Sequence, residues 1–137
     1  MNSIKYRGGY KYQLAEDYSL ETGIRAHKLI DAEYIQMWPD GRLVIKEGYA
    51  WDGPSGPALD TRNFMRGSLV HDALYQLMRE GRLDHADYRG QADRALRAIC
   101  LEDGMSSVRA WWVYVGVRWG AGPAAEPINN RPILVAP

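Results

Sequence analysis

The chain has 137 residues, which fits a single domain and leaves too few residues for two hydrophobic cores of ordinary size. Seventeen basic residues balance 17 acidic ones, which argues against nucleic-acid binding driven by net charge, and the single cysteine excludes an intrachain disulfide. No apolar run reaches the roughly 18 residues of a transmembrane helix, and the N-terminus lacks the apolar stretch of a signal peptide. We therefore expect a cytoplasmic protein in a reducing compartment, with Cys100 as a core residue.

Residues 1–50 have the pattern of β-strands. The stretch "YKYQL" places Tyr10, Tyr12 and Leu14 on one face, and "AEYIQMW" and "RLVIKEGYAW" continue the period of two with aromatic and β-branched residues. Between the last two stretches, "PDGR" is a proline-glycine turn suited to a hairpin. The pattern predicts an antiparallel hairpin or meander whose last strand leads into the loop "YAWDGPSGP".

After residue 60 the hydrophobic period becomes that of helices. The stretch "DTRNFMRGSLVHDALYQLMREG" ends at the stop signal Gly81 and offers three capping residues, Asp60, Thr61 or Asn63. A second helix is predicted over residues 84–102, where Asp84 and Asp87 give an acidic first turn. A third, "SVRAWWVYVGVRWG", is rich in β-formers, but its length, its serine cap and its terminal glycine favour a helix.

The whole pattern predicts an α+β fold, an N-terminal antiparallel β-hairpin or meander followed by a three-helix core. We expect one domain over residues 1–122, in which residues 1–50 are β-rich and residues 51–120 form a loop and the helical core. Residues 123–137 contain four prolines and no period, so they are predicted to form an extended C-terminal arm.

His71 and Asp72 stand side by side in the first helix, so their side chains point about 100° apart. His71 shares its stripe with Leu74, Tyr75 and Met78, the predicted inward face of the helix. A buried histidine needs a partner for its second ring nitrogen. On this residue alone, a core histidine bonded to a backbone carbonyl is as well supported as a functional one.

Asp93 is the predicted partner of His71. His71 lies about ten residues before the turn between the first two helices, and Asp93 lies about ten residues after it. Two antiparallel helices therefore bring both positions together, and a carboxylate that faces an imidazole fixes its tautomer and stabilises the imidazolium. The alternative for Asp93 is an exposed carboxylate that pairs with Arg97 at the i+4 position.

The loop "WDGPSGP" combines the carboxylate of Asp52 with the turn-forming residues Gly53 and Gly56. Calcium takes six to eight oxygen ligands and often mixes carboxylates with backbone carbonyls from a tight loop. Asp72 faces a different direction from His71 and is suited to join such a site. The alternative is a plain connection between a strand and a helix.

In combination, these features resemble the catalytic core of the phospholipase A2 superfamily, particularly its small bacterial secreted branch. In that group an Asp-Gly calcium loop precedes a helix with His-Asp-x-x-Tyr, and a later helix supplies the aspartate that supports the histidine. This chain has Asp52-Gly53, then His71-Asp72-Ala73-Leu74-Tyr75, then Asp93, and the resemblance covers residues 49–120. The chain also resembles a family of short phage and prophage proteins with an Asp-Gly loop, a His-Asp-x-x-Tyr helix and an Ala-Asp helix. This second likeness extends over the β-rich part.

The phospholipase resemblance implies a calcium-dependent lipid esterase. His71 would be the general base that activates water, and Asp93 would orient His71. Tyr75 and Tyr114 would support Asp93 through hydrogen bonds. Trp111, Trp112 and Trp119 would line an acyl groove, although a tryptophan stripe on a helix is more often part of a core.

The resemblance also implies the ligands of the calcium ion. Asp72 and Asp52 would bind it together with loop carbonyls near Trp51 and Gly53. The ion would polarise the ester carbonyl and hold the developing oxyanion. The expected partner is then a phospholipid or a membrane surface, with no nucleic acid, and a phage enzyme would be virion-associated or released on lysis.

Two alternatives stay open. The first is a non-catalytic structural or interaction protein of a phage particle that retains the same scaffold and contacts phage structural proteins. The second is a metal phosphohydrolase built on His71 and Asp72, for which the chain offers only His27 and His85 as further histidine ligands.

Overall fold

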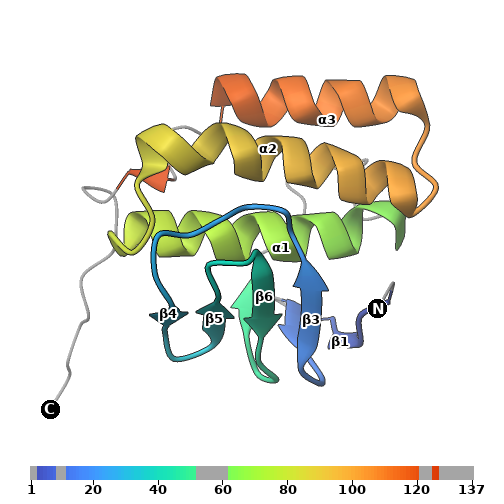
Figure 1. Cartoon of the computed structure of the whole chain (residues 1–137). Helices are drawn as coiled ribbons and strands as arrows, with labels where there is room; N and C mark the ends of the chain where they lie inside the picture. Colours follow the sequence, from blue (N-terminus) through green and yellow to red (C-terminus); the bar gives the residue numbers. More distant parts are fainter. Residues whose placement is uncertain (1–2, 9–11, 52–61, 121–124, 127–137) are drawn as a thin grey trace, which may run out of the picture.

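The computed structural model describes residues 3–8, 12–51, 62–120 and 125–126 (Figure 1). Strands come first and helices follow, so the predicted α+β class is confirmed. The strands are β1 (Tyr6–Arg7), β2 (Tyr12–Leu14), β3 (Tyr18–Glu21), β4 (Ile30–Asp31), β5 (Ile35–Met37), β6 (Arg42–Ile45) and β7 (Ala50–Trp51). The helices are α1 (Arg62–Arg79), α2 (His85–Glu102) and α3 (Ser107–Gly120).

The described strands pair into two small antiparallel sheets. One sheet has the order β1-β2-β7 and the other the order β3-β6-β5-β4. The predicted hairpin is confirmed, because β5 and β6 pair with Met37 opposite Leu43. Its turn closes where the amide of Gly41 donates to the carbonyl of Trp38 at 3.0 Å, and Gly41 has a φ of 102°, a conformation that favours glycine.

The stretch "RLVIKEGYAW", in which the sequence shows a strand period throughout, does not form one continuous strand. It forms β6 and β7 in two different sheets, separated by a turn in which the amide of Tyr49 donates to the carbonyl of Lys46 at 3.1 Å. Gly48 in this turn has a φ of 93° and so breaks the extended backbone. As expected, the strand before the glycine loop ends at Trp51.

The three predicted helices are confirmed, including α3, whose residues are rich in β-formers. Asp84 caps α2, because its side chain accepts a hydrogen bond from the amide of Ala86 at 3.2 Å. Ser106 caps α3, since its hydroxyl accepts from the amide of Arg109 at 3.2 Å. Asn63 lies inside α1 and is not its cap, whereas residues 60 and 61 lie outside the described residues.

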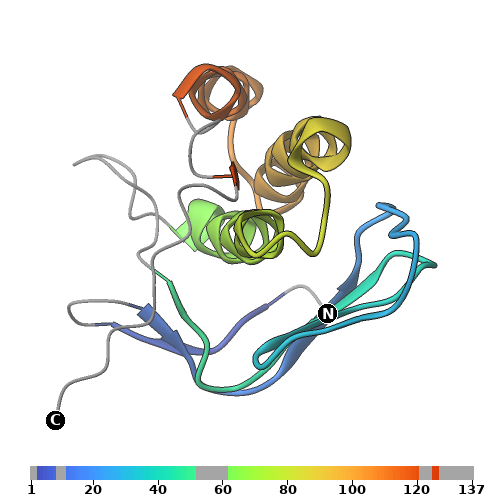
Figure 2. The ribbon, with the colours of Figure 1, turned by 90° about the vertical axis from the view of Figure 1, so that its left-hand side faces the viewer.

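The helices stack in order away from the sheets. Figures 1 and 2 show the strands on one side of α1, with α2 and α3 on its other side and α3 outermost. Gly67 of α1 faces α2 closely, because a Cβ atom there would lie 2.9 Å from Leu96 Cδ1 and 3.0 Å from Cys100 Sγ. Cys100 is buried as predicted, and burial raises the pKa of its thiol to about 12.

The tryptophans of α3 lie on the surface, so a place in the core was the wrong expectation. Trp111, Trp112 and Trp119 are 49%, 67% and 86% exposed, and the small Ala110 is the buried residue of this helix. In the predicted C-terminal arm, Ala125 is buried in the main core, and residues 123–124 and 127–137 lie outside the described residues. None of the described helices is long and apolar enough to cross a membrane.

Candidate functional site

The predicted pair of His71 and Asp93 forms between α1 and α2. The Nε2 atom of His71 lies 2.7 Å from Asp93 Oδ1, and the two residues are 6% and 0% exposed. The remaining members of the predicted inward stripe of α1, Leu74, Tyr75 and Met78, are also buried. The alternative, an exposed Asp93 that pairs with Arg97, is therefore excluded.

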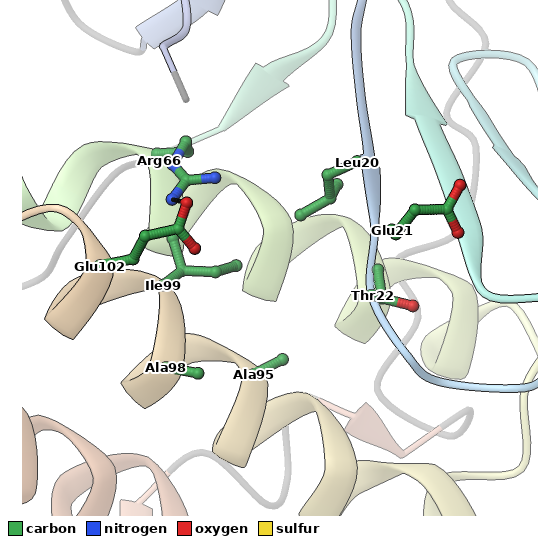
Figure 3. Close-up of a pocket in the computed structure, with 8 residues that line it drawn as sticks. All are labelled: Leu20, Glu21, Thr22, Arg66, Ala95, Ala98, Ile99 and Glu102. Carbon is green, nitrogen blue, oxygen red and sulfur yellow. Dashed lines mark ion pairs between the residues drawn. The ribbon is translucent and has the colours of Figure 1, made fainter. Parts of the chain in front are cut away.

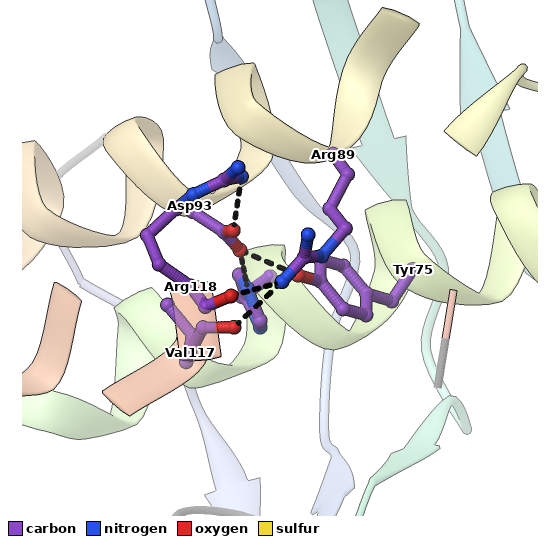
Figure 4. A network of polar contacts seen from close by, with 6 residues as sticks. Tyr75, Arg89, Asp93, Val117 and Arg118 are labelled. Atoms are coloured by element: carbon purple, nitrogen blue, oxygen red, sulfur yellow. Dashed lines mark hydrogen bonds and ion pairs between the residues drawn. The ribbon is translucent and has the colours of Figure 1, made fainter. Parts of the chain in front are cut away.

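Asp93, on α2, receives hydrogen bonds from both of the other helices. From α1, Tyr75 donates its hydroxyl to Oδ1 at 2.6 Å, beside the His71 bond to the same oxygen. From α3, Arg118 Nη1 donates to Oδ2 at 2.9 Å (Figure 4). We call His71, Tyr75, Asp93 and Arg118 the Asp93 cluster.

The cluster keeps Asp93 ionised. Burial alone would raise the pKa of Asp93, but the hydrogen bonds from His71 and Tyr75 and the pairing with Arg118 outweigh it and hold this pKa below its usual range. Burial and the carboxylate both raise the pKa of the Tyr75 hydroxyl, so Tyr75 stays a neutral donor. An ionised carboxylate only accepts hydrogen bonds, so the His71 proton shared with Asp93 sits on Nε2.

Arg89 fixes the end of α3 that carries Arg118. Its Nη2 atom donates to the carbonyl of Val117 at 3.3 Å and also to the carbonyl of Arg118 (Figure 4). These carbonyls belong to the last turn of α3, where no intrahelical donor follows and where the helix dipole favours a cation. Arg89 thereby holds Arg118 beside Asp93.

Tyr114, the second predicted support of Asp93, lies elsewhere. Its ring packs on Trp111 with the centroids 5.8 Å apart. Among the described residues, the hydrogen bonds to the Asp93 carboxylate come from His71, Tyr75 and Arg118. Arg118 is therefore the further donor to Asp93 that Tyr114 was expected to be.

The predicted calcium ligands fall only partly within the described residues. Asp52 and Gly53 lie outside them, whereas Asp72 is half-buried on α1. Trp51, the last residue before the loop, is buried, and its Nε1 donates to the hydroxyl of Ser68 at 3.1 Å. Ser68 stands one turn before Asp72, so the loop starts beside the helical turn that carries Asp72. The described part of the chain contains no cluster of three or more histidine, cysteine or acidic side chains suited to a metal.

A separate cavity of about 360 Å³ lies between β3, α1 and α2 (Figure 3). Its walls are formed by eight residues: Leu20, Glu21, Thr22, Arg66, Ala95, Ala98, Ile99 and Glu102. None of the predicted site residues lines it. Its one cation, Arg66, is already paired with Glu102 at 3.1 Å and with Asp103 at 2.9 Å. The cavity therefore offers no unpaired cation to an anionic ligand.

Residues 29–117 match the family described as "Protein of unknown function (DUF1353)". The match covers more than half of the chain. The chain belongs to the DUF1353 family. No curated protein and no solved structure matches this chain. The DUF1353 match runs from the residue before β4 into the last turn of α3 and includes His71, Asp72, Tyr75 and Asp93.

Arg118 is the member of the Asp93 cluster that the sequence reasoning missed, and it lies one residue beyond the DUF1353 match. Arg118 could have been found by the same sequence feature that paired His71 with Asp93, which is equal separation from the turn between two helices. Asp93 and Arg118 stand at nearly equal separations from the turn at residues 103–106 that joins α2 to α3. An antiparallel helix pair brings such positions together, and a carboxylate facing an arginine there predicts an ion pair.

Proposed function

We propose that this DUF1353 protein is a calcium-dependent lipid esterase of the phospholipase A2 type, with His71 as general base. The observation that carries the proposal is the bond of 2.7 Å between the buried His71 Nε2 and Asp93 Oδ1. It is supported by the order of the Asp-Gly step, the His-Asp-x-x-Tyr helix and the later aspartate in the sequence.

The proposed mechanism follows from the proton positions in the Asp93 cluster. Because the His71 proton sits on Nε2, the lone pair of the neutral ring is on Nδ1, and Nδ1 is the base. Nδ1 takes a proton from water while the water oxygen forms a bond to the ester carbonyl carbon. The proton then passes from His71 to the alcohol oxygen as the ester C–O bond breaks, which yields a fatty acid and a lysolipid. Asp93 stabilises the imidazolium between these steps.

In the proposed site, Asp72 and Asp52 would hold calcium together with the carbonyls of Trp51 and Gly53. When bound, the ion would polarise the ester carbonyl. The bond from Trp51 to Ser68 supports this assignment, because it starts the loop beside the turn of α1 that carries Asp72. A phage or prophage source is also part of the proposal. Its support is the shared pattern of Asp-Gly loop, His-Asp-x-x-Tyr helix and Ala-Asp helix.

A second candidate is a non-catalytic interaction protein of a phage particle. The observation in its favour is that Asp93 is paired with Arg118 as well as with His71. A buried carboxylate with all its partners is also the way in which a purely structural polar core is stabilised. In that case the Asp93 cluster would hold the three helices together, and the protein would hydrolyse no ester.

The deciding experiment measures fatty-acid release from phosphatidylglycerol vesicles with calcium and with a chelator. We expect calcium-dependent release by the natural chain and a loss of at least 100-fold in His71→Asn, in line with the usual contribution of a general base. His85→Asn is the matched control, since His85 stands at the start of α2 outside the Asp93 cluster. If the natural chain releases no fatty acid and binds no calcium, the interaction protein is the better description.

A further inference from the structure

The outer face of α3 is apolar and exposed. It consists of the exposed Val108, Trp112 and Trp119 and the half-buried Val115, whose spacing of four, three and four residues puts them on one side of the helix, opposite the buried Ala110. Val108, Trp112 and Trp119 are 69%, 67% and 86% exposed. Figures 1 and 2 show that α3 is the helix farthest from the sheets. Exposed tryptophans and valines that share one side of a helix are typical of an interaction site.

Arginines border this face on its α2 side. The guanidinium of Arg97 lies 5.3 Å from the ring centroid of Trp111, which is itself 49% exposed. The guanidiniums of Arg94 and Arg118 are neighbours, because their Nη1 atoms lie 3.3 Å and 3.4 Å from the point where a Cβ of Gly90 would stand. Within the described residues, no carboxylate forms an ion pair with Arg94 or Arg97.

We propose that the outer face of α3 is a docking surface for a bilayer that contains anionic phospholipids. Tryptophan rings are suited to the boundary between acyl chains and headgroups, because the ring is apolar and its N–H is polar. A helix that lies in this boundary with arginines beside it binds anionic lipid more tightly than zwitterionic lipid. Trp112 and Trp119 would enter the boundary, and Arg94 and Arg97 would contact lipid phosphates.

A second copy of the chain fits this surface less well than a bilayer. Residues 107–120 contain two arginines and no acidic residue. A symmetric contact through the outer face would instead bring Arg94 and Arg97 of two copies near one another, and among the described residues no carboxylate forms an ion pair with either of them. An anionic bilayer supplies the negative charge that the face lacks.

This inference rests on the proposed function in one respect: an esterase that acts on lipid needs a surface that binds lipid. The same helix carries Arg118, which donates to Asp93. Docking through α3 would therefore put the Asp93 cluster one helix away from the bilayer.

The test measures sedimentation with vesicles of phosphatidylglycerol and phosphatidylcholine in equal proportions, compared with vesicles of phosphatidylcholine alone. We expect binding to the anionic vesicles, at least tenfold weaker for the double variant Trp112→Glu and Trp119→Glu. The matched control is Leu29→Glu, which changes an apolar residue that is 52% exposed and directly precedes β4, a strand on the other side of α1 from α3 (Figure 1). A double variant Arg94→Gln and Arg97→Gln should lose most of the preference for anionic vesicles.

Each outcome bears on the inference. Absence of sedimentation with anionic vesicles would overturn it, as would equal binding by the tryptophan double variant. A concentration-dependent dimer that the same variant abolishes, without vesicle binding, would assign the face to a second copy instead. Vesicle binding without fatty-acid release would leave the inference standing and refute the proposed esterase, so the two failures are distinguishable.

Discussion

Arg118 of α3 donates to the Oδ2 atom of Asp93 at 2.9 Å, on the opposite oxygen from His71. The side chain of Arg118 is 34% exposed, whereas Asp93 is fully buried. A single carboxylate therefore ties α3 to α1 through α2. The charge of Asp93 is compensated whether or not His71 carries a second proton.

Arg118→Gln should separate the structural from the catalytic role of this contact. Glutamine can keep one hydrogen bond to Asp93 but not the charge, so we expect a loss of about 1–2 kcal/mol in the free energy of unfolding. If His71 is a general base, the Asp93 carboxylate without the Arg118 cation should raise the apparent pKa in the pH profile of ester hydrolysis. Arg118→Lys keeps the positive charge and should return this apparent pKa to that of the natural chain. Urea unfolding and the pH profile are the two measurements. An unchanged stability in Arg118→Gln would show that the ion pair contributes nothing.

Tyr75→Phe removes one donor from the buried carboxylate and keeps the ring. We expect it to lower the free energy of unfolding by about 1.5–3 kcal/mol, because the lost bond has a charged acceptor. Tyr88→Phe is the matched control, since its hydroxyl donates at 2.8 Å to the neutral backbone carbonyl of Arg25. Its expected cost is about 1 kcal/mol. The comparison by urea unfolding would contradict our account of Tyr75 if both variants cost the same.

Acid should weaken the protein through Asp93. Its pKa is lowered in the folded state, so its contribution to stability is complete above the unfolded pKa of about 3.9 and is lost as the pH falls through the folded value. The difference in unfolding free energy between the natural chain and Asp93→Asn should therefore shrink as the pH falls below about pH 4. Asp87→Asn, a change at an exposed carboxylate in the first turn of α2, should change far less. A difference that stays constant down to about pH 2 would rule out this linkage.

The sequence was sufficient for features that depend on local pattern and on the symmetry of a helix pair. The three helices follow from caps, stops and hydrophobic period, and the contact between His71 and Asp93 follows from their equal distance from one turn. The split of the strands into two sheets was not predictable in this way, because it depends on which distant strand each one meets. The pairing of β2 with β7 joins residues about 38 positions apart.

The exposed surface of α3 shows a second reason why a prediction from the sequence can be wrong. Composition alone suggests that Trp112 and Trp119 are buried, because large apolar side chains usually are. Burial depends on how many neighbours a helix has, and α3 is the last helix of the stack, where α2 is its main neighbour among the described elements. Ala110 is small enough to let the two helices approach, so the tryptophans on the other side stay in contact with solvent.

Arg66 offers a test of stability away from the Asp93 cluster. It is 4% exposed and joins three elements, because it donates to Tyr18 of β3 at 2.9 Å and pairs with Glu102 and Asp103 at the end of α2. Burial opposes its charge, but the hydrogen bonds with Asp103 and Tyr18 raise its pKa.

Arg66→Met leaves the Asp103 carboxylate without this partner, so we expect urea unfolding to show a loss of about 3–5 kcal/mol. Adding Asp103→Leu should recover part of that loss, and Arg62→Met, at an exposed position of the same helix, should stay within about 0.5 kcal/mol of the natural chain. A cost for Arg66→Met as small as that of the control would mean that the buried ion pair merely offsets its own desolvation.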